Sequence, residues 1–352
     1  MTSLGAVATG PSSGRSDIMS GIKQSPATRR SVLIGGAAGA ALGVAPALGE
    51  QKLGPPPHQK GPRVFLDYDQ VELDAAYDQE AYQPNIAQVS KRLASTSEFT
   101  RSRIGPPTRV SYGPSDIEKL DIFRTQQANA PIFVFIHGGA WRAALAKNYS
   151  FPAEMFIKAG AHYVVPDFVW VQDAGGNLAV LADQVRRAIA WTYRNAASFG
   201  GDPQRLYLGG HSSGGHLGGV ALTTDWEKEF GLPPDMIKAA MLVSGMYDLK
   251  PVRLSKRSSY IKFDDAVEEA LSPQRHIERI RCPLTLAYAS YDTPEFQRQT
   301  RDFAAALQAA NKPVQLIVGE NYSHLDFIET LANPYGILGS AALVQMKLAQ
   351  PS

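Results

Sequence analysis

One pentapeptide in the sequence has the residue types and spacing of a nucleophilic turn. Gly210-His211-Ser212-Ser213-Gly214 follows the apolar, β-prone run Leu206-Tyr207-Leu208 and leads into a helix-compatible stretch that begins near Gly215. Small flanking residues let a strand fold back sharply into a helix, which strains the central residue and exposes its hydroxyl. The pattern predicts that Ser212 is a nucleophile. Taken alone, such a motif can also be a glycine-rich loop that only joins a strand to a helix.

A serine nucleophile requires a base to accept its proton and a third group to orient that base. His324 lies in a loop just after the last apolar run of the chain, and Asp292 has the same placement after the preceding run. The chain order is therefore Ser212, Asp292, His324. This order is typical of catalytic residues at the carboxyl ends of parallel strands. We expect these three residues to form a catalytic triad.

Other residues compete for these roles. Asp302 is the main alternative acid, but the pattern after Pro294 predicts that it lies on the exposed face of a helix. His211 and His216 flank the serine turn. Because His211 directly precedes the strained residue, it cannot easily reach back as the base. We expect both histidines to pack beneath or beside the turn.

Acyl transfer also needs donors for the oxygen that becomes negative in the transition state. The run Ile132–Ile136 ends in His137-Gly138-Gly139-Ala140-Trp141, where glycines allow backbone N–H groups to point into a site. We expect Gly138, Gly139 and the N–H of Ser213 to form this oxyanion hole. A Gly-Gly turn that merely closes a strand is the alternative. Trp141 and Trp170 are candidates for the wall of an apolar substrate pocket, or equally for the core.

The sequence does not favour metal or cofactor chemistry. His211 and His216 are five residues apart with no second ligand set nearby, and there is no H-E-x-x-H motif, no phosphate loop and no dinucleotide fingerprint. We therefore expect no metal and no cofactor. The single cysteine, Cys282, excludes an intrachain disulfide and heads an apolar run, so a buried structural thiol is expected.

The composition is that of a globular protein without a charged binding face. The 352 residues include 35 basic and 33 acidic side chains scattered along the chain, for a net charge of +2. This balance argues against nucleic acid or an acidic membrane surface as a partner and leaves a small-molecule ester or amide substrate. The oligomeric state is not indicated.

The first fifty residues have the pattern of an export signal. Arg29-Arg30 stands directly before the short apolar stretch Ser31–Ala45, which is too short to span a bilayer, so we expect no stable membrane anchor. The paired arginines indicate the twin-arginine route of bacteria and a periplasmic or secreted protein, with cleavage after Ala47 or Gly49. The segment that precedes the paired arginines is unusually long, so Met19 is an alternative site for the start of translation. A disordered low-complexity tail is the other interpretation.

The secondary-structure elements that could position these residues lie after the export signal. Residues 50–108 read as a linker and an N-terminal helical arm, and residues 109–352 as one catalytic domain. Strands are expected at Arg109–Tyr112, Leu120–Arg124, Ile132–Ile136, Tyr163–Pro166, Leu206–Leu208, Ala240–Ser244, Leu284–Ala289 and Val314–Val318. Their alternation with helical patterns predicts an α/β fold with a mostly parallel central sheet and helices on both faces. One amphipathic crossover helix is expected from Leu178 to Ile189, and residues 247–280 could add to a lid.

These motifs resemble those of the α/β-hydrolase superfamily from about Leu73 onward. His137-Gly138-Gly139-Ala140-Trp141 is similar to the H-G-G-x-W of arylformamidase-like (kynurenine formamidase-like) hydrolases, rather than to the H-G-G-G of the neighbouring hormone-sensitive-lipase-like carboxylesterases. Residues 210–217 resemble their G-H-S-A-G-x-H-L, with Ser213 in place of alanine. Weaker similarities lie at Val243–Leu249 and Asp292–Phe296.

The resemblance implies hydrolysis of an aryl formamide or a related small ester through an acyl-enzyme on Ser212, with His324 as base and Asp292 orienting it. A peptidase is an alternative, although the helical arm and lid favour small, partly aromatic acyl substrates. A binding protein that has kept the fold and lost turnover is the alternative from a different class.

Overall fold

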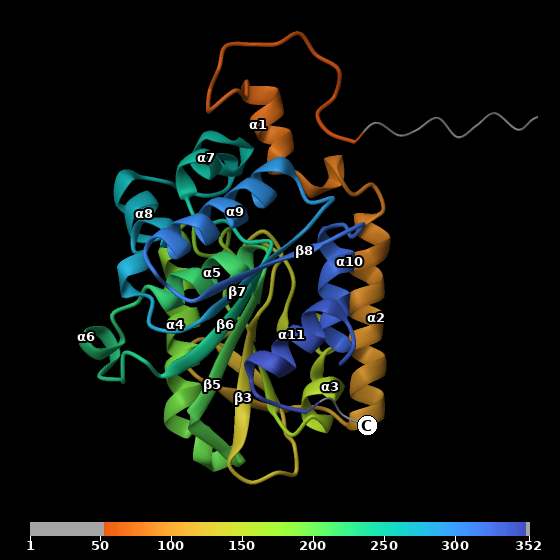
Figure 1. The fold of residues 1–352 in the computed structure, drawn as a ribbon, viewed down its shortest axis with the longest axis vertical. Coiled ribbons are helices and arrows are strands. Elements are labelled where there is room, and N and C mark those ends of the chain that lie inside the picture. Colours follow the sequence, from red (N-terminus) through yellow and green to blue (C-terminus); the bar gives the residue numbers. More distant parts are fainter. Residues whose placement is uncertain (1–52, 350–352) are drawn as a thin grey trace, which may run out of the picture. The chain divides into compact units, whose positions relative to one another are not determined.

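The alternating apolar runs build one mixed sheet in a computed structural model that describes residues 53–349 (Figure 1). The expected export signal, residues 1–49, lies outside the described residues. All eight predicted strands are present: β1 (Thr108–Ser111), β2 (Lys119–Phe123), β3 (Ala130–Ile136), β4 (His162–Pro166), β5 (Gly201–His211), β6 (Ile237–Val243), β7 (Leu284–Ala289) and β8 (Val314–Gly319). Strand β5 is longer than the apolar run that predicted it, because it pairs with β3 from Gly201 and with β6 as far as His211.

The strand order brings the sequence-predicted residues to one edge of the sheet. The order is β1-β2-β4-β3-β5-β6-β7-β8; the pairs β1–β2 and β2–β4 are antiparallel, and all other pairs, including β4–β3, are parallel. Strands β3 and β4 are buried along their whole length, as expected of strands covered on both faces. The carboxyl ends of β5, β6, β7 and β8 lie side by side. The predicted mostly parallel sheet is confirmed.

Helices cover both faces of the sheet and build two apolar clusters (Figure 1). One cluster packs beneath α4, α5 and α9, and the other beneath α2, α3, α10 and α11. The bounds of these helices are α2 (Ile86–Ile104), α3 (Ala153–Lys158), α4 (Leu178–Asn195), α5 (Ser213–Leu222), α9 (Pro294–Ala309), α10 (His324–Glu329) and α11 (Ile337–Gln345). The predicted crossover helix is α4, which buries Leu181, Val185 and Ile189 on one stripe.

Two groups of short elements lie beyond the strand ends that carry the candidate residues. The first precedes the sheet and contains α1 (Gln70–Ala76) and η1 (Gln79–Ala81). The second falls in the predicted insertion and contains α7 (Leu249–Leu254), η4 (Lys256–Ser259), α8 (Asp265–Ala270), η5 (Pro273–Arg275) and η6 (Ile277–Arg279). Figure 1 shows α1, α7 and α8 gathered at this end. The two groups are joined where Arg257 Nη2 donates to the carbonyl oxygen of Tyr77 at 2.9 Å.

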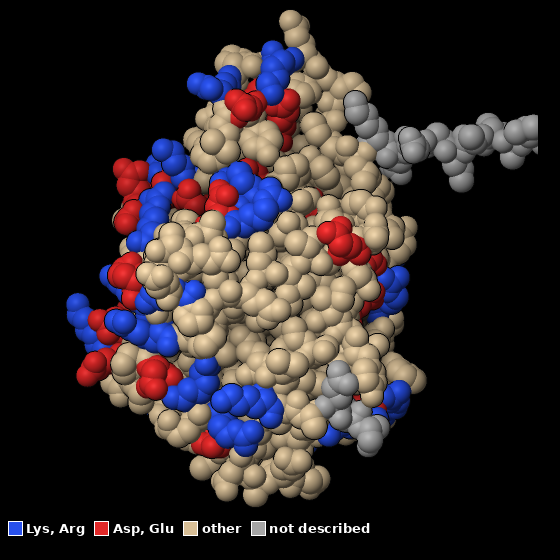
Figure 2. Space-filling model, viewed as in Figure 1, with Lys and Arg blue, Asp and Glu red and all other residues tan. Residues whose placement is uncertain are grey.

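The remaining elements are short. They are η2 (Ala146–Tyr149), η3 (Ala196–Phe199), α6 (Trp226–Phe230) and η7 (Thr330–Ala332). Within residues 53–349, no helix combines the length and the apolarity that crossing a bilayer requires. Figure 2 shows acidic and basic side chains interspersed on the face in view. That face therefore presents no extended patch of one sign.

Candidate active site

Ser212 occupies a strained turn between β5 and α5. Its backbone has φ 58° and ψ −126°, a conformation that residues with side chains rarely adopt. The turn closes because its glycines leave room for backbone atoms. A Cβ on Gly210 would lie 2.4 Å from the carbonyl oxygen of Gly214, and one on Gly214 would lie 2.1 Å from that of Ile136. The chain therefore has the strand-turn-helix geometry that the pentapeptide predicts.

Asp292 and His324 meet at the ends of β7 and β8. His324 Nδ1 donates to Asp292 Oδ1 at 2.6 Å, and both side chains are buried. Because Nδ1 carries the proton in this bond, Nε2 of the neutral ring is free to accept one. The second carboxylate oxygen, Oδ2, accepts from Ser244 Oγ at 2.6 Å and from the N–H of Ala289 at 2.9 Å. These bonds fix the carboxylate, which in turn fixes the imidazole.

Ser212 and His324 line a single cavity of about 810 Å³. Both belong to the described part of the chain, and no hydrogen bond joins Ser212 Oγ to the His324 ring there. Catalytic hydrogen bonds often tighten only when substrate is bound. The structure thus places the three sequence-predicted residues at one edge of the sheet, with Asp292 bonded to His324 and Ser212 facing the same cavity.

The glycine loop after β3 lies directly beside the serine turn, because Ile136 is in register with Gly210. A Cβ on Gly138 would lie 3.0 Å from the carbonyl oxygen of His211, and Gly139 has φ 119°. Within the described chain, the N–H of Gly139 has no hydrogen-bond acceptor, and the N–H of Gly138 faces the hydroxyl oxygen of Tyr149. Ser213 is the first residue of α5, where a helix N–H has no intrahelical acceptor. These are the three donors expected for an oxyanion hole.

The glycine loop is held in place by polar contacts to α5. The N–H of Trp141 donates to Ser213 Oγ at 3.2 Å, a bond that an alanine at this position could not make. Trp141 Nε1 donates to His216 Nδ1 at 3.2 Å, and His216 Nε2 donates to the carbonyl oxygen of Leu271 at 2.8 Å. Burial lowers the pKa of His216 to about 4, which keeps the ring neutral. His216 is therefore a buried support beneath the site.

His211 lies beside the base. It is fully buried, its Nε2 donates to the carbonyl oxygen of His324 at 3.1 Å, and the two ring centroids are 4.6 Å apart. Burial holds the pKa of His211 well below its ordinary value. The expectation that His211 and His216 pack beside the turn is confirmed. Asp302 is also placed as expected, because it lies on α9 with an exposed side chain paired to Arg298.

The two tryptophans that the sequence offers equally for the pocket wall and for the core lie away from the cavity. Trp141 is 1% exposed beneath the glycine loop, and Trp170 donates from Nε1 to the carbonyl oxygen of Ala144 at 2.9 Å. Neither lines the cavity. Its apolar wall comes instead from α2, through side chains that include Ile86 and Leu93. Its charged side chains are Asp78, Glu80, Arg142, Lys256 and Arg257.

Sequence reasoning missed two residues of this site. Ser244 directly follows β6 and bonds Asp292, so the strand-end argument that found Asp292 could have found it. Arg257 lines the cavity from η4. Nothing in the sequence pattern separates it from the other 34 basic residues.

Comparison with known proteins agrees with this geometry. The BD-FAE family model matches residues 120–307, more than half of the chain. The chain belongs to the BD-FAE family. A kynurenine formamidase of Danio rerio is 30% identical over 276 residues, covering 74% of this chain and 91% of that protein. The esterase LipC of Mycobacterium tuberculosis is 26% identical over 238 residues, covering 63% and 57%.

Solved structures show the same fold. A crystal structure of a protein from Silicibacter sp. TM1040 superposes with a TM-score of 0.67 and 26% identity, covering 76% of this chain and 98% of the other. The resemblance to the α/β-hydrolase fold and to formamidase-like and esterase-like hydrolases is therefore confirmed. This member of the BD-FAE family is an enzyme, a hydrolase of the ester and amide class.

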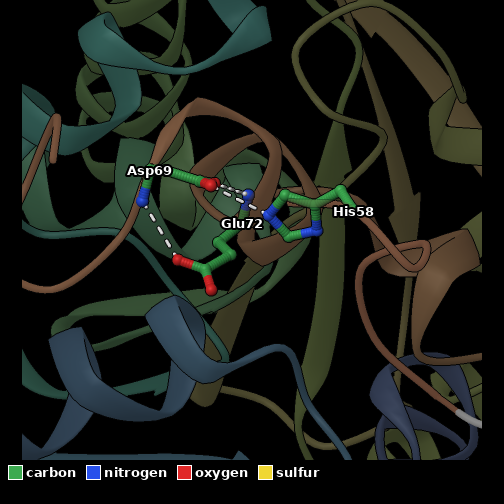
Figure 3. Close-up of side chains that lie close together, drawn as sticks. All are labelled: His58, Asp69 and Glu72. Atoms are coloured by element: carbon green, nitrogen blue, oxygen red, sulfur yellow. Dashed lines mark hydrogen bonds and ion pairs between the residues drawn. The ribbon is translucent and has the colours of Figure 1, made fainter. Parts of the chain in front are cut away.

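A second polar cluster of this BD-FAE hydrolase lies at the start of α1 (Figure 3). His58 Nε2 lies 2.8 Å from Asp69 Oδ2, and Asp69 and Glu72 each accept a hydrogen bond from the other's backbone N–H. Lys60 pairs with Glu72. Backbone N–H groups lower the pKa of Asp69 to about 2. These bonds form a capping box, so the cluster is explained by helix capping.

Proposed function

We propose that this chain is a serine hydrolase that cleaves a small ester or an aryl formamide through an acyl-enzyme on Ser212. The observation that carries the proposal is the 2.6 Å bond from His324 Nδ1 to Asp292 at the edge of a cavity that also contains the strained Ser212. Asp292 and His324 would act as orienting acid and general base. Gly138, Gly139 and Ser213 would supply the oxyanion hole.

The proposed reaction has two halves. Ser212 Oγ attacks the substrate carbonyl carbon while its proton passes to His324 Nε2, and the oxygen that becomes negative is stabilised by the three N–H groups. The imidazolium then gives the proton to the leaving alcohol or amine, and the acyl group remains on Ser212. Water attacks this ester, its proton goes to His324, and the acid is released as Ser212 regains its proton. The same steps serve an ester and a formamide, which differ only in the leaving group.

Two features favour a small substrate. The cavity is about 810 Å³, within the range of small-molecule sites. The arm closes one side of it with α2 and η1, which leaves little room for an extended peptide. The relatives named kynurenine formamidase favour an aryl formamide, and the relative named esterase favours an ester.

The first experiment compares kcat/KM for N-formylkynurenine and for a short-chain 4-nitrophenyl ester. The chain would start at about Glu50, and Ser212→Ala would be the control. We expect Ser212→Ala to lower kcat by about 10⁴-fold or more without unfolding the protein. A strong preference for one substrate decides between formamidase and esterase activity. If neither substrate shows turnover that depends on Ser212, the proposal fails.

Labelling with a fluorophosphonate probe separates an enzyme from a binding protein. The probe should label the wild-type chain and should not label Ser212→Ala, because only an activated serine reacts. A wild-type chain that remains unlabelled would favour a protein that has kept the fold without turnover.

We also propose that the chain is exported by the twin-arginine route, on the basis of Arg29-Arg30 before an apolar stretch. In a bacterial host, the wild-type chain should be recovered outside the cytoplasm. The double variant Arg29→Lys, Arg30→Lys should stay inside. Equal export of the two chains would contradict this route.

A further inference from the structure

Arg257 is a buried guanidinium in the wall of the cavity. Only 6% of the residue is exposed, and it lines the same cavity as Ser212 and His324. Its Nη1 donates to Tyr260 Oη at 2.9 Å and its Nη2 to the carbonyl oxygen of Tyr77 at 2.9 Å. Both acceptors are neutral. Its Nε is buried and has no hydrogen-bond partner in the described chain.

The acids nearest to this arginine in the hydrogen-bond network are paired with other cations. Glu295, which accepts from Tyr77 Oη, is held by Arg298 at 2.7 Å. Asp78, the neighbour of Tyr77, pairs with Lys256. No carboxylate among the described residues forms an ion pair with Arg257. Proteins rarely keep a buried charge without a counter-charge, because its desolvation is then uncompensated.

Other groups that line the same cavity also suit an anion. The guanidinium carbon of Arg142 lies 4.5 Å from the ring centroid of Tyr260, so two arginines flank this tyrosine. Arg142 likewise has no ion pair within the described chain. Gln79 lines the cavity from η1, and both polar atoms of its amide are buried without a partner. Among residues 53–349, Glu80 is the one unpaired acid lining the cavity, and it is exposed.

The position of Arg257 relative to the reacting serine follows from the packing. Its guanidinium carbon lies 5.5 Å from the ring centroid of Trp141, and the backbone N–H of Trp141 donates to Ser213 Oγ. Arg257 is thus one indole away from the loop that carries the oxyanion donors. A small substrate acylating Ser212 could place a group at its far end against Arg257.

We propose that Arg257 determines specificity for substrates that carry a carboxylate away from the scissile bond, with Gln79 and Arg142 completing the subsite. The inference rests on the proposed function, because it locates the carboxylate relative to acylation at Ser212. A carboxylate supplies the counter-charge that Arg257 lacks and accepts the hydrogen bond that Nε does not make. The substrate class is then an anionic ester or amide.

Matched esters test this subsite. Turnover of mono-4-nitrophenyl glutarate is compared with that of neutral 4-nitrophenyl pentanoate in the wild type, Arg257→Met and Arg257→Lys. We expect Arg257→Met to lower kcat/KM for the glutarate ester by about 10- to 100-fold, and that for the pentanoate ester by less than about 3-fold. Arg257→Lys should recover part of the loss. Equal losses on both esters would overturn the proposal.

Arg253→Met is the control, because Arg253 lies in the same insertion, pairs with Asp265 and Glu268, and does not line the cavity. It should leave the ratio of the two kcat/KM values unchanged. Failure of the proposed function is a separate outcome, since Ser212→Ala would then leave the turnover of both esters unaltered.

A measurement on the wild type covers the case in which Arg257→Met does not fold. Benzoate and neutral benzamide are compared as inhibitors of pentanoate ester hydrolysis. We expect competitive inhibition by benzoate with an inhibition constant about 10-fold or more below that of benzamide. Equal constants would overturn the proposal.

Discussion

At the scale of the residue, the site depends on which oxygen of Asp292 faces which donor. Oδ1 accepts from His324, whereas Oδ2 accepts from Ser244 and from the N–H of Ala289. Every donor in this set needs an acceptor, so only a carboxylate fits. An amide must turn its NH₂ either toward the histidine or toward two other donors.

Asp292→Asn should therefore lower kcat strongly while leaving the fold intact. When the amide turns its NH₂ toward His324, the ring loses the acceptor that holds its Nδ1 proton, and we expect a fall of about 10⁴-fold in kcat. Ser244→Ala removes one hydrogen bond to the same carboxylate and should lower kcat by about 10-fold. Both effects are measured by steady-state kinetics, with whichever of N-formylkynurenine and the 4-nitrophenyl ester the wild type turns over better. Equal effects of the two variants would contradict the orienting role of Asp292.

At the scale of the element, α2 is both a wall of the cavity and a fixed part of the domain. Ser97 is fully buried at its centre, donates to the carbonyl oxygen of Asn148 at 2.7 Å and accepts from the N–H of Phe151 at 3.1 Å. Arg92 adds exposed ion pairs to Asp326 and Glu329 on α10, the helix that begins with His324. Pairs of this exposed kind contribute little to stability, so Ser97 is the stronger link.

Ser97→Ala should lower the free energy of unfolding by about 1 to 3 kcal/mol, because the buried N–H of Phe151 and the partly buried carbonyl of Asn148 lose their partner. Ser95→Ala is the matched control, since the Ser95 hydroxyl is exposed and bonds only within its own helix. It should change stability by less than about 0.5 kcal/mol. Urea unfolding of the three proteins provides the comparison. Similar midpoints for wild type and Ser97→Ala would show that α2 is not fixed at this point.

At the scale of the whole molecule, burial of several histidines couples stability to pH. Burial lowers the pKa of His137, His162, His211 and His216, the last to about 4. In the unfolded chain these rings have the ordinary pKa near 6.5. Between the folded and the unfolded pKa the unfolded state binds more protons, so stability falls as the pH falls.

The wild type should therefore lose stability as the pH falls from about 6.5 toward 4. Each buried ring contributes up to about 1.4 kcal/mol per pH unit in that window, and nothing above it. His216→Gln removes one such contribution and should reduce the slope by about that amount. Urea unfolding at pH 7.5, 6.5 and 5.0 tests this expectation. A slope that is the same in His216→Gln and the wild type would show that His216 is not the neutral, buried support inferred above.

The strands, the mostly parallel sheet and the strand-end positions of Ser212, Asp292 and His324 could all be predicted from the amino-acid sequence. These features depend on local sequence. A run of apolar residues predicts a strand, and glycines whose neighbours leave no space for a Cβ form the serine turn. Because the carboxyl ends of parallel strands share one edge of the sheet, the positions of the strand ends were enough to predict that these three residues lie close together. The glycine loop after β3 follows from the same rule.

The surroundings of these residues depend on long-range packing and could not be predicted from the sequence. Trp141 and Trp170 have the size and polarity of pocket residues, yet their indole N–H groups donate hydrogen bonds to His216 and to the carbonyl oxygen of Ala144, and neither tryptophan lines the cavity. Arg257 bonds a carbonyl 180 residues earlier in the chain, and no sequence pattern reports such a contact. Burial, the absence of a counter-charge and the shape of a cavity arise from packing between elements. They therefore became visible only once the arm and the insertion were placed against the sheet.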